Sequence, residues 1–125
     1  MKQVVENRDW LIKRCIEGSP NELCGFIMRD GSVVELPNAA RDPVNNFEMA
    51  RHHLVKRVPD PSKIYAIWHS HPNGNSVPSA TDMNAVKIGA VEHHWIYLIV
   101  TPNGVFEHIM ELEDDESITV RTFAV

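Results

Sequence analysis

Apolar positions recur with a helical period near the start of the chain. From Val4 to Glu17 the apolar residues approximate one face of a helix, and Gly18-Ser19-Pro20 then supplies a stop signal. A shorter stretch at 49–58 has similar spacing and is followed by two prolines. We therefore expect helices over 4–17 and 49–58. The apolar face assigned to the first helix consists of Val4, Val5, Trp10, Leu11, Ile12, Cys15 and Ile16.

Short apolar runs bounded by turn signals predict the strands. The runs at 23–29 and 32–36 flank Asp30-Gly31, and those at 95–101 and 105–111 flank Pro102-Asn103-Gly104, so both pairs are expected to form hairpins. The run at 63–69 is apolar on both faces, as in a central buried strand. Residues 118–123 either form a last strand or fray. The acidic residues before them are interpreted as a solvated tail: Glu111, Glu113, Asp114, Asp115 and Glu116.

A loop and a third helix are expected between the central strand and the last hairpin. Prolines and an Asn-Gly pair disfavour both helix and strand over 71–78, and Ser79 begins a helical pattern that extends to Ala90. The element order predicts an α/β fold, with a mixed β-sheet of about five or six strands packed by helices. We expect one domain over 1–125, with a core at about 4–112 and an acidic C-terminal segment at 113–125.

Composition and charge narrow the class of protein. The chain has 125 residues, of which 43% are hydrophobic and 23% charged, which is typical of a globular domain. Its net charge of -5 argues against nucleic acid or an anionic membrane as a partner. No apolar run approaches the roughly 20 residues of a membrane span. The polar residues near the start do not fit a signal peptide, so a cytoplasmic protein is expected.

His69 and His71 carry the first chemical signal. Residues two apart on a strand point to the same face, so the two imidazoles can converge on one point. Asp82 follows in the first turn of the expected third helix. Two imidazoles and a carboxylate form a three-ligand set for Zn²⁺ that leaves a fourth position for water. Ser79-x-x-Asp82 is equally a good helix-capping pattern, and both interpretations can hold together.

Glu22 and Ser79 could complete a hydrolytic site. Glu22 lies at the start of the first strand, which can pair beside the strand of His69, so its carboxylate could accept a proton from the water. Ser79 could donate a hydrogen bond to a developing oxyanion. Taken alone, Glu22 also fits a surface carboxylate. A second chemistry, with Cys24 as nucleophile and His69 as base, gives His71 and Asp82 no joint role.

These residues together form a recognisable signature. The motif resembles that of the JAMM (MPN-plus) metalloproteases, which cleave peptide or isopeptide bonds, often after the C-terminal glycine of ubiquitin-like proteins. The resemblance covers about 4–111 and implies a curved mixed sheet with helices on both sides, a cytidine-deaminase-like architecture. The positions that carry it are Glu22-x-x-Gly25 and His69-x-His71-Pro72-x6-Ser79-x-x-Asp82.

The resemblance assigns a role to each candidate residue. It implies that His69, His71 and Asp82 hold zinc, that Glu22 binds and activates the water, and that Ser79 stabilises the oxyanion. The segments 24–26 and 37–47 are similar to the metallopeptidase half of lambda-type phage tail assembly proteins. Those proteins usually continue into an NlpC-type cysteine peptidase domain, so the chain is expected to be a free-standing version or a fragment.

The expected activity is that of a zinc metallopeptidase that hydrolyses peptide or isopeptide bonds, and phage tail assembly is one pathway that the resemblance suggests. Its partner would be a protein or peptide substrate, either the tail of a ubiquitin-like protein or a phage tail protein. Alternatives are a protease that processes a ubiquitin-like modifier or a sulfur carrier, a zinc hydrolase of a non-peptide amide, and a non-catalytic JAMM-like interaction module. The oligomeric state stays open.

Overall fold

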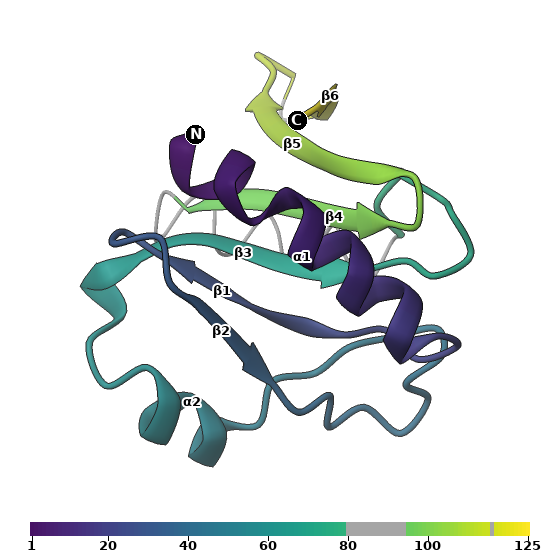
Figure 1. The fold of residues 1–125 in the computed structure, drawn as a ribbon. Coiled ribbons are helices and arrows are strands. Elements are labelled where there is room, and N and C mark those ends of the chain that lie inside the picture. Colours follow the sequence, from purple (N-terminus) through teal and green to yellow (C-terminus); the bar gives the residue numbers. More distant parts are fainter. Residues whose placement is uncertain (80–94, 116) are drawn as a thin grey trace.

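The computed structural model describes residues 1–79, 95–115 and 117–125, and Figure 1 shows their arrangement. The predicted helix from Ser79 to Ala90 lies outside these residues, apart from Ser79 itself. The described elements are α1 (Lys2–Gly18), β1 (Cys24–Met28), β2 (Val33–Leu36), α2 (Arg51–Arg57), the 3-10 helix η1 (Pro61–Lys63), β3 (Ile64–Ser70), β4 (Ile96–Thr101), β5 (Gly104–Leu112) and β6 (Ile118–Ala124).

The strands form one mixed sheet in the order β2-β1-β3-β4-β5-β6. Strands β3 and β4 are parallel, and the other neighbours are antiparallel. Helix α1 lies across one face of the sheet, and helix α2 lies beside β2 (Figure 1). The predicted α/β class is therefore confirmed, as is the central position of the third strand. In the part of the chain that the structure describes, no helix is long and apolar enough to cross a bilayer.

The sheet has an apolar cluster on each face. On one face Val4, Leu11 and Cys15 of α1 pack against Trp68 and Leu98. The cluster on the other face is made by Cys24, Phe26, Leu36, Val58 and Ile64, with Phe47, Met49, Leu54 and Trp95 packed against it. Strands covered on both faces are apolar on both faces, which explains the continuous apolar run of β3.

The buried stripe of α1 is narrower than the sequence indicates. Val5, Trp10 and Ile16 were assigned to the apolar face, but they are 57%, 41% and 55% exposed. A straight helix meets a sheet along one line, so only the residues on a stripe roughly 100° wide can be buried. That stripe contains Val4, Leu11 and Cys15, and Ile12 packs at its edge, partly buried.

The helix predicted over 49–58 begins two residues late. Met49 forms an isolated β-bridge with Asn38, and the amide of Ala39 donates to the carbonyl of Glu48 at 2.8 Å. Those extended contacts hold Met49 outside the helix, which begins at Arg51. The segment 38–49 is thereby a folded loop whose two ends pair with each other.

Gly25 brings β1 and β2 unusually close. A Cβ atom at this position would lie 2.1 Å from the backbone oxygen of Val34 and 3.0 Å from Cε2 of Trp68. Real Cβ atoms do not approach that closely, so only glycine fits between the neighbouring strand and the buried indole. The Gly25 of the sequence signature is therefore a packing requirement of the strand that leads out of the site.

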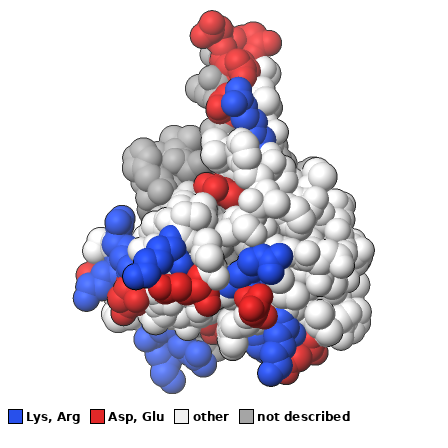
Figure 2. Space-filling view, turned by 45° about the horizontal axis from the view of Figure 1, so that its top comes forward, with Lys and Arg blue, Asp and Glu red and all other residues white. Residues whose placement is uncertain are grey.

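The chain ends in a hairpin that projects from the rest of the molecule (Figures 1 and 2). Pairing of β4 with β5 ends at Tyr97 and His108, whereas β5 and β6 stay paired as far as Leu112 and Ile118. Residues 118–123 were expected either to form a last strand or to fray, and they form the strand β6. Glu113, Asp114 and Asp115 are exposed, as a solvated segment would be, but they lie in the turn between β5 and β6, so the interpretation of a free tail is wrong for them.

Candidate metal centre

Three of the candidate residues meet in a buried group. Glu22, His69 and His71 are 5%, 5% and 6% exposed, and one ligand atom from each lies within 4.8 Å of the others. The Nε2 atoms of the two imidazoles are 3.1 Å apart. Glu22 comes from the segment before β1, His69 from β3, and His71 from the residue after β3.

The pairing of β1 with β3 brings these residues together. Cys24 lies opposite His69 in the antiparallel register. The ladder continues by one pair, because the amide of Ser70 donates to the carbonyl of Leu23 at 2.8 Å and the amide of Leu23 donates to Ser70 Oγ at 2.7 Å. The next position therefore sets Glu22 against His71, and this follows from the backbone register alone.

Neighbouring groups fix the orientation of both imidazoles. The Nδ1 atom of His71 lies 2.7 Å from the carbonyl oxygen of Asn75. A carbonyl can only accept, so Nδ1 carries the proton and Nε2 presents its lone pair to the buried group. The ring of His69 stacks on Phe47, with centroids 4.5 Å apart and an interplanar angle of 22°. The ring of His71 thus has the second-nitrogen hydrogen bond that metal-binding histidines usually make, and the ring of His69 is packed in one orientation.

The donor set fits a metal ion. Nitrogens bound about 2.05 Å from a tetrahedral zinc would lie about 3.3 Å apart. The observed 3.1 Å between the two Nε2 atoms is close to that separation. A carboxylate and two imidazoles inside a protein are also the ligands that divalent transition metals prefer. Glu22, His69 and His71 could therefore hold an ion, although imidazole suits several metals and does not by itself select zinc.

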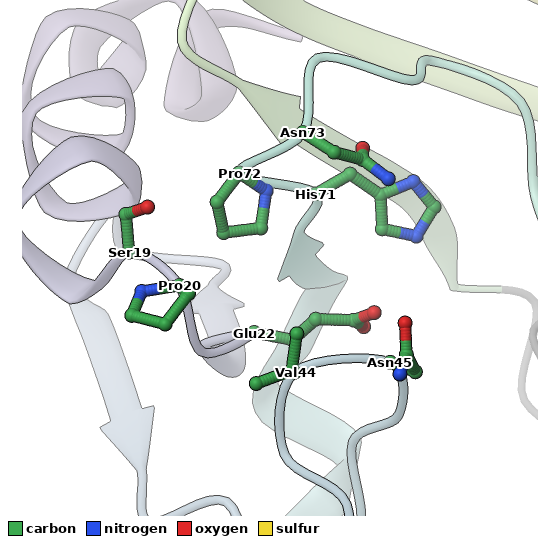
Figure 3. A pocket seen from close by; sticks show the side chains of 8 residues that line it. All are labelled: Ser19, Pro20, Glu22, Val44, Asn45, His71, Pro72 and Asn73. Atoms are coloured by element: carbon green, nitrogen blue, oxygen red, sulfur yellow. The ribbon is translucent and has the colours of Figure 1, made fainter.

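A cleft opens beside this group. Two adjoining hollows of about 270 and 150 Å³ share Glu22, Val44, Asn45, His71 and Asn73 in their walls. Figure 3 shows the larger one, with the carboxylate of Glu22 and the imidazole of His71 directed into it. The remaining described residues of the two walls are Ser19, Pro20, Pro72, Asn75, Val77 and Ser79. Among all these residues, Glu22 alone has a charged side chain.

The structure thus brings some of the five candidate residues together and not others. Glu22, His69 and His71 are brought together, and Ser79 lies at the wall of the smaller hollow. Asp82 lies outside the described residues. The chemical roles of the five residues remain predictions.

Asn38 holds the segment of Glu22 and was not singled out from the sequence. Its Nδ2 donates to the carbonyl of Glu22 at 2.8 Å and to the carbonyl of Asn46 at 2.9 Å. Its Oδ1 accepts from the amides of Ala40 and Glu48 at 3.0 and 3.1 Å. The amide of Glu22 in turn donates to a carbonyl in the same loop at 2.7 Å. Both backbone groups of Glu22 are therefore bonded to the loop 38–48.

Cys24 is a poor nucleophile in this environment. It is fully buried, and its Sγ donates to the carbonyl of Leu36 at 3.6 Å. Burial, with smaller contributions from Glu35 and Glu22, raises the pKa of the Cys24 thiol to about 12. The thiol is protonated at neutral pH, which argues against the alternative in which Cys24 attacks with His69 as base.

Fold and site together define a class of protein. A mixed sheet with a buried glutamate and two histidines at the end of its central strand is the arrangement of a JAMM-like domain. The sequence itself matches the family described as prokaryotic homologs of the JAB domain over residues 6–113. The chain therefore belongs to this family, as its signature indicates. A comparison with curated proteins finds no significant match.

Proposed function

We propose that this protein is a zinc metallopeptidase that hydrolyses a peptide or isopeptide bond. The observation that supports this best is the burial of Glu22 beside His69 and His71 at the wall of a cleft. A buried carboxylate next to two imidazoles has a high desolvation cost, and such groups are concentrated at functional sites.

Each residue has a distinct task in the proposed reaction. His69, His71 and Asp82 would hold the zinc. When bound, zinc supplies a water whose pKa is lowered to about 7. Glu22 accepts the proton of the attacking water and donates it to the leaving nitrogen. Ser79 donates a hydrogen bond to the carbonyl oxygen of the scissile bond as negative charge develops there.

We propose that the substrate is a protein of phage tail assembly and that the reaction occurs in the host cytoplasm. The segment 37–47, which carries the resemblance to phage tail assembly proteins, contributes Val44 and Asn45 to the cleft wall. The loop that distinguishes this chain is therefore the loop that a substrate would touch. Tail genes beside the coding sequence would favour this role, whereas a neighbouring ubiquitin-like sulfur carrier would favour processing of that carrier.

Metal analysis and peptide cleavage test the proposed activity. The purified protein is expected to bind one equivalent of zinc. The zinc-loaded protein is then incubated with a library of synthetic decapeptides and lysine-branched isopeptides, and the products are identified by mass spectrometry. We expect cleavage that is lost in the Glu22→Gln protein. Stoichiometric zinc without any Glu22-dependent cleavage would contradict the proposal and favour a non-catalytic interaction module.

A further inference from the structure

A turn in the loop beside the cleft presents Asn45 to the candidate metal centre. Residues 43–45 form this turn, and Asn45 contributes to the walls of both hollows together with Glu22 and His71. In Figure 3 the amide oxygen of Asn45 is on the side of the Glu22 carboxylate, and the amide nitrogen is directed away from it. The side chain therefore has one polar end in the cleft and the other outside it.

Asp42 determines which end of the amide faces the cleft. The Nδ2 of Asn45 donates to Oδ2 of Asp42 at 2.9 Å. A carboxylate can only accept, so the opposite orientation of the amide would set two oxygens against each other. The amides of Asn45 and Asn46 also donate to the Asp42 carbonyl, at 3.3 and 3.0 Å, which fixes the turn. Asn45 Oδ1 is consequently a preoriented hydrogen-bond acceptor.

A hydrogen-bond acceptor in this position favours a substrate that carries a hydrogen-bond donor. The described cleft walls are neutral apart from Glu22, so charge complementarity offers a substrate little there. Val44 next to Asn45 is 45% exposed and adds apolar surface to the same wall. A neutral wall with an acceptor and an aliphatic side chain matches an extended peptide, which has N–H groups at regular intervals between its side chains.

We propose that Asn45 is a substrate-positioning residue whose Oδ1 accepts a hydrogen bond from a backbone N–H one or two residues from the scissile bond. Val44 contacts the substrate side chain beside that N–H. This inference rests on the proposed peptidase function. Asn45 does not take part in proton transfer. It holds the peptide so that the scissile carbonyl lies within reach of Glu22 and Ser79.

Ester substitution in the substrate tests this proposal. The decapeptide that is cleaved best in the library is resynthesised with single backbone N–H groups near the scissile bond replaced by ester oxygen. The wild-type protein is expected to lose about twofold to tenfold in kcat/KM at one position, the size of one hydrogen bond. Asn45→Leu is expected to lose a similar factor on the parent peptide and nothing further at that position. The dissociation constants of the same peptides for Glu22→Gln and for Glu22→Gln/Asn45→Leu should show the same pattern.

The controls separate positioning from a structural role. Asn46→Ala changes the neighbouring residue, whose side chain lines a different hollow, and should retain the ester penalty of the wild type. Asn45→Ala replaces Asn45→Leu if thermal unfolding shows that the leucine variant is misfolded. If each ester substitution lowers kcat/KM by the same factor in the wild type and in the Asn45 variants, the inference is overturned, and the proposed peptidase function is unaffected. Absence of any Glu22-dependent cleavage would overturn both.

Discussion

Glu22 is the residue on which the proposed chemistry depends most. Its carboxylate is buried beside two histidines, and its backbone is held on both sides by the loop 38–48. A substitution there changes the acid–base group with little freedom for the chain to rearrange. Substitution of Glu22 is therefore a direct test of whether the cleft is catalytic.

Glu22→Gln should reduce turnover strongly and preserve the zinc that His69, His71 and Asp82 would hold. Glutamine keeps the shape of the side chain and loses its basicity, and general acid–base catalysis contributes on the order of 10²- to 10⁴-fold. We expect a loss in kcat of at least that size, with zinc content measured in parallel on the same preparation. Near-wild-type turnover with full zinc would show that another group moves the proton.

Cys24→Ala should leave turnover nearly unchanged. With a pKa of about 12, only about 10⁻⁴ of the Cys24 thiol is ionised at about pH 8, and the side chain is fully buried. The native protein should therefore resist iodoacetamide at Cys24, while the same thiol reacts readily in guanidinium chloride. Peptide mapping of the alkylated protein provides the measurement. Loss of activity in a folded Cys24→Ala protein would revive the cysteine mechanism.

Among the elements, β1 carries the tightest constraint. It is paired on both sides and lies between the segment of Glu22 and the turn to β2. Its register with β3 sets the position of the metal-binding group, so a disturbance of β1 should affect stability and the site together.

Gly25→Ala should destabilise the fold severely. The new methyl group would lie 2.1 Å from a backbone oxygen of β2, so the strands would have to separate. We expect a loss in the free energy of unfolding of more than about 3 kcal/mol, the upper range for overpacking. Gly104→Ala is the matched control, since its Cβ would meet Phe106 at 3.4 Å, which is an ordinary contact. Similar melting temperatures for the two variants would contradict the close packing at Gly25.

Asn38→Ala should weaken both stability and turnover. The substitution removes a side chain that bonds the carbonyl of Glu22 and one carbonyl and two amides of the loop, which is worth about 1–3 kcal/mol. Turnover should fall with it, because the backbone of Glu22 loses a partner. Asn21→Ala, at an exposed position, should change the free energy of unfolding by less than about 0.5 kcal/mol. Denaturant unfolding and kcat of both proteins give the comparison.

The elements show what a local pattern can and cannot predict. Each run bounded by a turn signal formed a strand close to its expected limits, since turn chemistry is decided by neighbouring residues. The buried face of α1 was only partly predicted. Its apolar residues cover most of the circumference, and the sheet beneath decides that Leu11 is buried and Ile16 exposed. The start of α2 was displaced by a contact of Met49 with Asn38, which no local pattern encodes.

In the molecule as a whole, the sequence predicts those parts of the candidate site whose positions are set by the geometry of the strands. The His-x-His spacing on a strand predicts convergence, and the pairing of neighbouring strands brings Glu22 to the histidines. Asn38, Asn45 and Asn75 could not be found in this way. Asn38 and Asn75 make their contacts to or through a backbone carbonyl, and Asn45 bonds the carboxylate of Asp42, so each contact depends on the path of a loop.

Metal removal should destabilise the protein, and acid should do the same. A ligand that binds only the native state stabilises it in proportion to the logarithm of its concentration over the dissociation constant. Zinc binds neutral imidazoles, so protons compete with the metal for the nitrogens of His69 and His71, and acid should release it. The melting temperature of the zinc-loaded protein should thus approach that of the chelated protein as the pH falls from about 7 to 5. Equal melting temperatures at pH 7 would contradict a metal site linked to folding.

The projecting hairpin of β5 and β6 should open more readily than the centre of the sheet. Among the described residues, the hairpin of β5 and β6 beyond His108 has strand pairing only within itself, whereas Ser70 and His71 are bonded to Leu23 and Val100 on opposite sides. Local unfolding begins where few contacts must break, so the hairpin can fray and re-form without exposing the core. The histidines lie where the sheet is bonded on both sides, so we expect this part to open less readily than the hairpin. We therefore expect the arrangement of the two histidines to persist while the tip of the hairpin moves.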